Sequence, residues 1–208
     1  NIEDLSRIFE NIFRERCTIG TGGYDDYIRY NSFLGSLYIK YVWCKYRDYL
    51  LSLKVDPTKI SFPKVGNPTG IMLNNNIISI QTLRHAYFAL EISKLLRSIK
   101  SPVCVEIGSG LGGQAYQTIK LCNKKISKYI LFDIPEVCSI SSYFLLTSLP
   151  KNNIRLFGEG PVSVSSQNNY DIGIFPHFSI EELPEDSVNL FYNSCSFSEM
   201  DEDCSKKY

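Results

Sequence analysis

The chain has 208 residues, of which 44% are hydrophobic and 21% charged, a balance typical of globular proteins rather than of disordered, collagen-like or low-complexity chains. Lysine plus arginine and aspartate plus glutamate both number 22, and this zero net charge argues against a nucleic-acid partner, which needs a basic surface. The hydrophobic runs are far shorter than the roughly 18 residues of a membrane span. The seven cysteines lack a CxxC spacing and there are two histidines, so we expect reduced thiols, no metal site and a cytoplasmic protein without a secretory signal.

The first half of the chain predicts mainly helices. Apolar side chains recur at helical spacing over residues 2–17 and again over 27–53. The second stretch is rich in tyrosine, which leaves open whether its apolar face packs against the protein or stacks on a sugar ring. The proline- and glycine-rich segment 62–70 predicts a loop. A short hairpin over residues 71–80 and a helix over 81–99 follow it.

From residue 101 onward the pattern changes to alternating strands and helices, which predicts an α/β core with a parallel sheet. We therefore expect a mostly helical cap over residues 1–100 and a core domain over 101–208. The expected strands are 103–107, 129–133, 170–175 and 188–192, the expected helices are 114–122 and 135–149, and 154–157 is a further strand or loop without an assigned place.

The most informative segment reads VEIGSGLGG, where a strand runs into glycines and a helix follows. Glycines allow a tight turn and a close approach of a ligand, and the helix N-terminus adds free N–H groups. Gly108, Gly110 and Gly113 fit the dinucleotide pattern GxGxxG. Gly108, Gly110 and Gly112 fit the pattern ExGxGxG of enzymes that use S-adenosylmethionine (SAM). Glu106 favours SAM, because a carboxylate suits its ammonium and sulfonium groups and disfavours a pyrophosphate.

Asp133 is expected to end the second strand, 20 residues after Gly113. A carboxylate at this place accepts hydrogen bonds from both hydroxyls of an adenosine ribose. The same side chain also suits the N-cap of the helix expected at Pro135, and the two roles are compatible. Because nicotinamide-binding folds share this aspartate, it predicts adenosine binding without separating the two cofactors.

Several segments together resemble a known family. VGNP, EIGSGLGG, FDIPE and NSCSFSEM, spread over about residues 60–201, are similar to the sugar O-methyltransferases, SAM-dependent enzymes often associated with bacterial surface-polysaccharide synthesis. LPEDSVNL resembles the stretch LPxxSxDLV that links strands three and four in SAM methyltransferases more generally. The resemblance implies a Rossmann-like SAM methyltransferase sheet. Such sheets have seven strands, so this sheet is expected to be truncated after strand four.

The resemblance also implies a set of site residues. The expected contacts to SAM are Glu106, Gly108, Gly110, Gly112, Asp133, Ile134, His177, Phe178 and Asn193. Methyl transfer needs a donor and an acceptor held in line and a base that removes the hydroxyl proton. The candidate bases are Glu199, after the fourth strand, and His85, on the helix before the core, and each also suits a plain structural role. The expected acceptor is a small molecule or glycan lying between the cap and residues 193–200.

Two other functions stay open on the sequence. A non-catalytic methyltransferase-like binding or scaffold subunit keeps the cofactor crevice and lacks a working base. A nicotinamide-dependent oxidoreductase uses the dinucleotide pattern of the same loop, but Glu106, the long helical extension and the LPEDSVNL segment disfavour it. Titration with SAM and with NAD distinguishes a methyltransferase from a nicotinamide-dependent oxidoreductase. A methyl-transfer assay distinguishes an enzyme from a scaffold. The sequence makes no prediction of oligomeric state.

Overall fold

The computed structural model describes residues 32–66, 68, 70–73, 75–122, 126–165, 169–194 and 196–200. The helix expected at 2–17 lies outside these residues, as do Cys17, Cys195 and Cys204. The chain divides into two compact units, Asn1–Leu90 and Glu91–Tyr208. The boundary between the units falls inside helix α5 (Ile80–Leu96), and the expected division at residue 100 stays a prediction.

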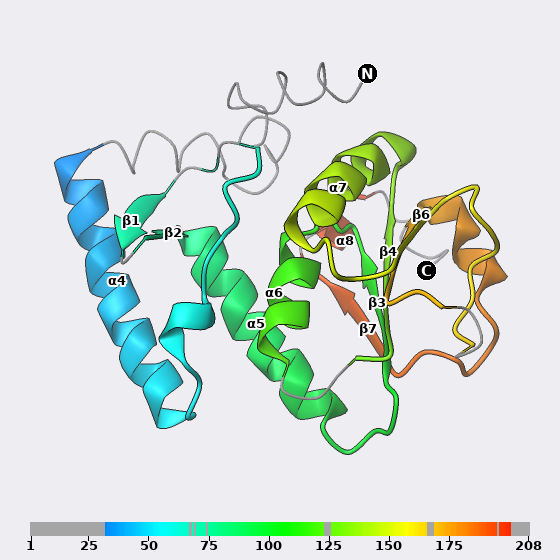
Figure 1. Ribbon diagram of the computed structural model, residues 1–208, viewed down its shortest axis with the longest axis horizontal. Helices are drawn as coiled ribbons and strands as arrows, with labels where there is room; N and C mark the ends of the chain where they lie inside the picture. Colours follow the sequence, from blue (N-terminus) through cyan, green and yellow to red (C-terminus); the bar gives the residue numbers. More distant parts are fainter. Residues whose placement is uncertain are drawn as a thin grey trace. The chain divides into compact units, whose positions relative to one another are not determined.

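The N-terminal unit is built on helix α4 (Phe33–Ser52), drawn in blue in Figure 1. Ser32 begins this helix, because its Oγ accepts a hydrogen bond from the Gly35 N–H at 2.9 Å and so satisfies a free donor of the first turn. The 3-10 helix η2 (Pro57–Lys59) follows. Strands β1 (Ile71–Leu73) and β2 (Asn76–Ile78) then pair antiparallel, which confirms the expected hairpin.

Helix α5 begins at a reciprocal pair of hydrogen bonds. The Ser79 Oγ accepts from the Thr82 N–H at 3.1 Å, and the Ser79 N–H donates to the Thr82 Oγ1 at 3.2 Å. This arrangement satisfies two backbone donors at once, as a capping box does. It explains why the helix expected over 81–99 starts directly after the hairpin.

The apolar pairs that set the helical pattern of α4 lie on an exposed face. Phe33 and Leu34 are each 76% exposed and Tyr41 is 61% exposed, whereas Ile39 and Leu50 are buried. Two roles were expected for this tyrosine-rich stretch, packing and sugar stacking. Ile39 and Leu50 pack against the protein. Tyr38 and Tyr41 are exposed, whereas Tyr46 and Tyr49 are partly buried.

The C-terminal unit contains a five-stranded parallel sheet, which confirms the expected α/β class and is compatible with a Rossmann-like fold (Figure 1). The spatial order of the strands is β5-β6-β4-β3-β7, and every neighbouring pair is parallel. The strands are β3 (Val103–Ile107), β4 (Lys128–Asp133), β5 (Ile154–Leu156), β6 (Ile172–Pro176) and β7 (Leu190–Asn193).

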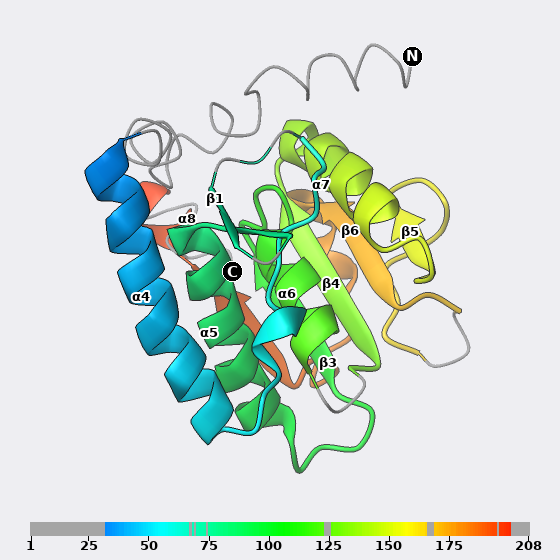
Figure 2. The same ribbon diagram turned by 60° about the vertical axis from the view of Figure 1, so that its left-hand side comes forward.

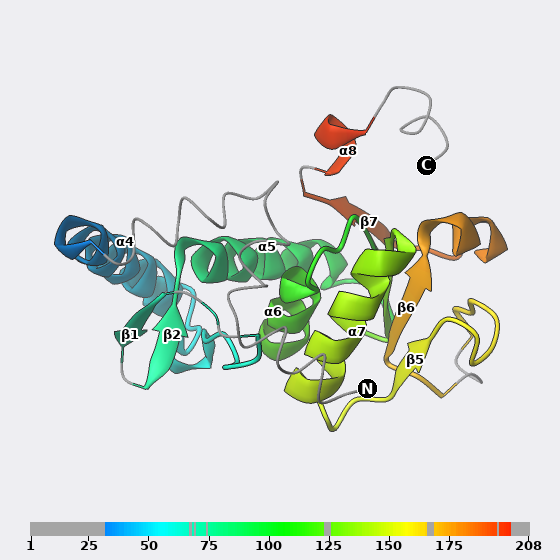
Figure 3. The same ribbon diagram turned by 90° about the horizontal axis from the view of Figure 1, so that it is seen from above.

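Helices α6 (Gly113–Leu121) and α7 (Pro135–Ser148) follow β3 and β4 and lie along one face of the sheet (Figures 2 and 3). Pro135 at the first turn of α7 suits its fixed φ and its missing N–H. The 3-10 helix η3 (His177–Glu182) and the short helix α8 (Ser196–Glu199) follow β6 and β7. No helix in the described part of the chain is long and apolar enough to cross a membrane.

The core of this unit is the sheet itself. All five residues of β3 are buried, as parallel strands covered on both faces require. Alternate residues point to opposite faces, so Val105 lies on one side of the sheet and Glu106 on the other. The first side carries the buried apolar cluster that includes Ile107, Phe132 and Phe175.

Two strands differ from the sequence expectation in a way that long-range pairing explains. The segment 154–157, which had no assigned place, joins the sheet as edge strand β5 beside β6. The fourth expected strand begins at Leu190 rather than at residue 188. Asn189 marks this start, because its Oδ1 accepts the Val103 N–H at 2.8 Å and its own N–H donates to the Val103 carbonyl at 3.0 Å.

Candidate cofactor-binding site

The glycine loop and Asp133 leave the sheet side by side. In the parallel pair of β3 and β4, Ile107 lies opposite Phe132. The Gly108 N–H donates to the Phe132 carbonyl at 2.9 Å, which continues the ladder one residue beyond the strand. Two segments that the sequence singled out separately therefore meet at the carboxyl edge of the sheet, where open α/β sheets bind their ligands.

Three glycines of the loop adopt left-handed backbone conformations, with φ of 72° at Gly108, 52° at Gly110 and 86° at Gly112. Such angles are costly for residues that have a Cβ atom. A Cβ on Gly108 would collide with Ser196, and one on Gly112 would lie 3.0 Å from a methyl group of Leu145. A Cβ on Gly110 would meet no atom within 4 Å. Two of the glycines thus serve packing, whereas Gly110 faces open space that a ligand can occupy.

One carboxylate oxygen of Asp133 holds the glycine loop, and the other binds the backbone of the following residue. Oδ2 accepts the Gly110 N–H at 2.8 Å and the Ser109 hydroxyl at 3.5 Å, and Oδ1 accepts the Ile134 N–H at 2.8 Å. Burial raises the pKa of Asp133, while these hydrogen bonds and the nearby His177 lower it. The N-cap residue of α7 is Ile134, with no side-chain cap bond. The N-cap role that the sequence allowed for Asp133 is therefore not seen.

Glu106 is a buried carboxyl that forms no ion pair with a described residue. Its side chain is 3% exposed, and its Oε2 accepts the Tyr129 hydroxyl at 2.9 Å. Burial raises the pKa of Glu106 to about 8; the hydrogen bond from Tyr129 opposes this shift and the charge of Asp133 adds to it. The ion pairs found among the described residues join other side chains. A buried carboxyl of this kind is either protonated or needs a positively charged group, such as one from a ligand, to stabilise its ionised form.

An exposed apolar surface lies beside Asp133. Ile134 is 49% exposed after β4, and Phe178 is 54% exposed after β6, the neighbouring strand. The Phe178 ring meets His177 edge-on at 5.6 Å between centroids and meets Phe157 in the same way at 5.6 Å. Exposed aromatic and aliphatic groups at the end of two parallel strands suit a planar ring that stacks against them.

Asn193 joins the ends of β7 and β3. Its Nδ2 donates to the Ile107 carbonyl at 2.8 Å and to the Ser196 hydroxyl. Its Oδ1 accepts the Phe197 N–H at 3.4 Å, at the start of α8. A Cβ on Gly108 would lie 3.8 Å from this amide. The structure thus places Asn193 next to the loop, as expected, with its amide already engaged in fixing the loop.

The two candidate bases lie in different units of the chain, and the structure gives no distance between them. Glu199 is the last residue of α8, and its side chain lies outside the described residues. His85 lies in α5 in the N-terminal unit, with its ring centroid 6.1 Å from that of Phe62. Both assignments stay predictions.

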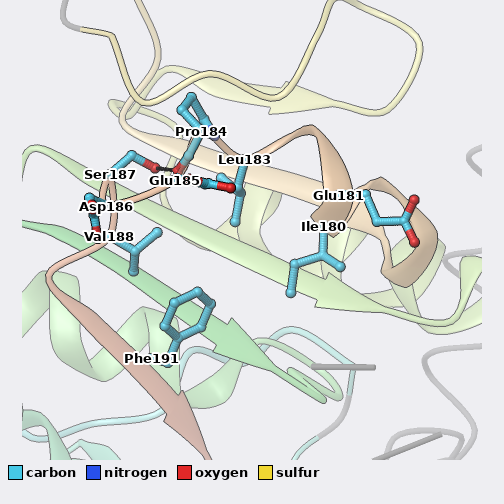
Figure 4. Close-up of a pocket in the computed structure, with 9 residues that line it drawn as sticks. All are labelled: Ile180, Glu181, Leu183, Pro184, Glu185, Asp186, Ser187, Val188 and Phe191. Carbon is cyan, nitrogen blue, oxygen red and sulfur yellow. Dashed lines mark hydrogen bonds between the residues drawn. The ribbon is translucent and has the colours of Figure 1, made fainter. Parts of the chain in front are cut away.

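A hollow lies on the face of the sheet away from Glu106. Its volume is about 380 Å³ (Figure 4). It is lined by Ile180, Glu181, Leu183, Pro184, Glu185, Asp186, Ser187, Val188 and Phe191. Phe191 pairs with Val105 and so shares the face away from Glu106. Sequence reasoning missed this hollow, because it took the LPEDSVNL segment only as a link between strands.

Comparison with protein-family models, with curated proteins and with solved structures found no match for this chain. Within the residues that the structure describes, no three His, Cys, Asp or Glu side chains are grouped as metal ligands are. Any function of the chain therefore has to be argued from the site itself.

Proposed function

We propose that the chain binds SAM at its glycine loop and acts as a SAM-dependent O-methyltransferase on a sugar hydroxyl, in surface-polysaccharide or glycoside synthesis. The observation that carries this proposal is a pair of carboxyl groups on adjacent parallel strands, Glu106 and Asp133, flanking a loop that is open at Gly110. Glu106 has no cation beside it among the described residues. A buried carboxyl without a neighbouring cation suits a positively charged ligand.

Three parts of SAM have a matching group at this edge of the sheet. The buried carboxyl of Glu106 suits the ammonium group. Asp133 accepts the Gly110 and Ile134 N–H groups and, at 3.5 Å, the Ser109 hydroxyl. One further lone pair and the position of the long Ser109 contact suit the two ribose hydroxyls. The exposed side chains of Ile134 and Phe178 suit the flat adenine ring.

The same charges disfavour a dinucleotide. A pyrophosphate is stabilised by free N–H groups and by cations. Here the Gly110 N–H is already bonded to Asp133, and the pKa of Glu106 is raised by burial without a compensating positive group. A pyrophosphate in this place would lie near the Asp133 carboxylate and would oppose the ionisation of Glu106. The nicotinamide alternative is therefore the weaker proposal.

The order of the strands also supports the proposal. The run β6-β4-β3-β7 corresponds to the order 3-2-1-4 of doubly wound sheets, in which the cofactor lies at the end of strand one. In this proposal β5 is an addition outside strand three.

For methyl transfer, SAM supplies a methyl group activated by its sulfonium. The chain has to hold the acceptor hydroxyl in line and take its proton. We assign the base to Glu199, at the end of the segment that follows β7, with His85 as the alternative. The hydroxyl of Ser194 in the same segment suits a neutral sugar, whereas the Ser196 hydroxyl already bonds Asn193 and the Ile107 carbonyl.

The test begins with calorimetric titration of the chain with SAM and with NAD. SAM is expected to bind and NAD is not. Asp133→Asn should weaken SAM binding by about tenfold or more, since a hydrogen bond to a charged group contributes about 1.5–3 kcal/mol. Asp171→Asn is the matched control, because Asp171 also accepts a backbone N–H, from Asn153 at 3.2 Å, but lies before β6 at the opposite edge.

Binding of NAD without SAM would overturn the proposal. A methyl-transfer assay on a panel of sugars then separates an enzyme from a scaffold. Glu199→Gln should lower the rate about 10²–10⁴-fold with little change in SAM affinity if Glu199 is the base. Binding of SAM without transfer to any acceptor favours the scaffold alternative.

A further inference from the structure

The surroundings of Glu106 consist of acids and neutral groups. Tyr129, which is fully buried, donates its hydroxyl to the carboxyl from the neighbouring strand β4. Cys104 lies two residues earlier on the same face of β3, and Tyr192 lies opposite Glu106 on β7. Asp133 raises the pKa of Glu106 by its charge. All four of these groups are neutral when protonated and negative when ionised, so none of them offsets a negative charge on Glu106.

The helices of this unit do not change that balance. The one charged residue of α6 is Lys120, which is exposed and lies 5.8 Å from the centroid of the Tyr116 ring. The one charged residue of α7 is Glu136, which is also exposed. In the part of α5 that belongs to this unit, Lys94 is paired with Glu91. Among the described residues, none of the groups that shift the pKa of Glu106 is a cation. In this proposal the positive charge that stabilises an ionised Glu106 therefore comes from the ligand.

We propose that Glu106 releases its proton to solvent when the ammonium group of a ligand binds beside it, and that Tyr129 is the positioning residue that sets the pH range of this exchange. The inference rests on the proposed function of the glycine loop. Binding and proton release balance in a simple way. The ligand brings one positive charge, the carboxyl loses one proton, and the buried site stays neutral.

The role of Tyr129 follows from the direction of its hydrogen bond. The phenol donates to the carboxyl, and a donor stabilises the ionised form more than the neutral form, so it lowers the pKa of Glu106. The pKa of Tyr129 itself is raised well above its usual value, mainly by burial and by the charge of Glu106. Tyr129 therefore stays a donor throughout the pH range in which Glu106 titrates. Removing its hydroxyl should move the Glu106 titration to higher pH.

The coupling predicts how affinity depends on pH. Because the pKa of Glu106 in the free protein is about 8, the carboxyl is mostly protonated at pH 6 and at pH 7. Affinity for SAM should therefore rise about tenfold from pH 6 to pH 7, and close to one proton should leave per ligand at pH 7. Above about pH 8 the ligand's own α-amino group loses its proton, and affinity should fall again.

The experiment is calorimetric titration of the 208-residue chain with SAM, in two buffers of different ionisation enthalpy, which measures the number of protons released. The matched ligand is 5′-methylthioadenosine, which keeps the adenosine and lacks the ammonium group. It should bind with no proton release and no change in affinity between pH 6 and pH 7. Glu106→Gln should abolish both effects for SAM.

Tyr129→Phe supplies the readout that a purely structural role would not move. At pH 8 this variant should release more protons than the unchanged protein, by at most about half a proton, because a larger share of its Glu106 is still protonated there. The ligand's own ionisation is the same in both proteins and cancels. Should Glu106→Gln fail to fold, as judged by circular dichroism, the Tyr129→Phe and methylthioadenosine comparisons still decide the question.

The possible failures are distinguishable. If SAM binds without proton release and with constant affinity from pH 6 to pH 7, the coupling is wrong and the proposed function stands. Equal proton release by Tyr129→Phe and the unchanged protein at pH 8 removes Tyr129 from the mechanism. If SAM does not bind at any pH, both the coupling and the proposed function are wrong.

Discussion

Replacing Gly110 with alanine should separate the stability of the fold from ligand binding. Gly110 has a φ of 52°, and a Cβ there would meet no atom within 4 Å. The cost to stability is therefore the left-handed backbone alone, about 1–2 kcal/mol. For a chain of this size that corresponds to a fall in the melting temperature of about 2–8 °C. Gly108→Ala should cost about 1–3 kcal/mol more, because its Cβ overlaps Ser196.

Ligand binding should respond differently. The new methyl group of Gly110→Ala occupies the open space in front of the loop, where we place the amino-acid part of SAM. Crowding by one methyl group costs about 1–3 kcal/mol, so SAM affinity should fall roughly 5- to 150-fold. Calorimetric titration with SAM measures the affinity, and thermal unfolding of the same sample measures the cost to the fold.

Gly158→Ala is the matched control. Gly158 has a φ of 90°, and a Cβ there also meets no atom within 4 Å. It follows β5, which β6 and β4 separate from β3 in the sheet. The two variants should lose the same stability, and Gly158→Ala should bind SAM as the unchanged protein does. Equal SAM affinity of Gly110→Ala and Gly158→Ala would refute the placement of the ligand at this loop.

The remaining predictions concern other parts of the C-terminal unit and one cysteine of α4. Phe178→Ala should weaken SAM binding by about 1–3 kcal/mol in a titration, because it removes the ring on which we place the adenine; unchanged affinity would exclude that stacking. Tyr170→Phe should cost about 1–3 kcal/mol in denaturant unfolding, since the Tyr170 hydroxyl bonds both the N–H and the carbonyl of Ser163; an unchanged unfolding midpoint would contradict it. With a thiol reagent at neutral pH, Cys44→Ala should lower the number of reactive thiols by one, because Cys44 is exposed. Cys138→Ala should leave that number unchanged, because Cys138 is buried and its pKa is raised, mainly by burial, to about 11.

Local patterns were enough to predict the class of fold. The alternation of apolar runs with amphipathic stretches predicted β3, β4, α6 and α7 within one or two residues at each end. The glycine loop and the aspartate at the end of β4 were also visible in the sequence. The reason is that helical and strand periodicity, proline at a helix start and glycine at a turn are properties of neighbouring residues.

Partners that are distant in the chain were not predictable in this way. The hydrogen bond between Glu106 and Tyr129 joins residues on two strands and depends on their register. The same holds for the edge strand β5. Its three residues form a strand only because they pair with β6. Nothing in the local sequence marks Tyr129 as a partner of a carboxyl rather than as an ordinary buried ring.

The sequence alone therefore determined that this protein has a parallel α/β unit, a glycine-rich loop after its first strand and an aspartate after the next one. The tertiary structure decided that Gly110 faces open space while Gly108 and Gly112 pack against side chains. It also decided that Glu106 is buried beside a tyrosine, with no cation among the described groups that shift its pKa. The backbone angles of a loop follow from its own residues, but its open space and the charge beside it depend on which distant segments the sheet brings together.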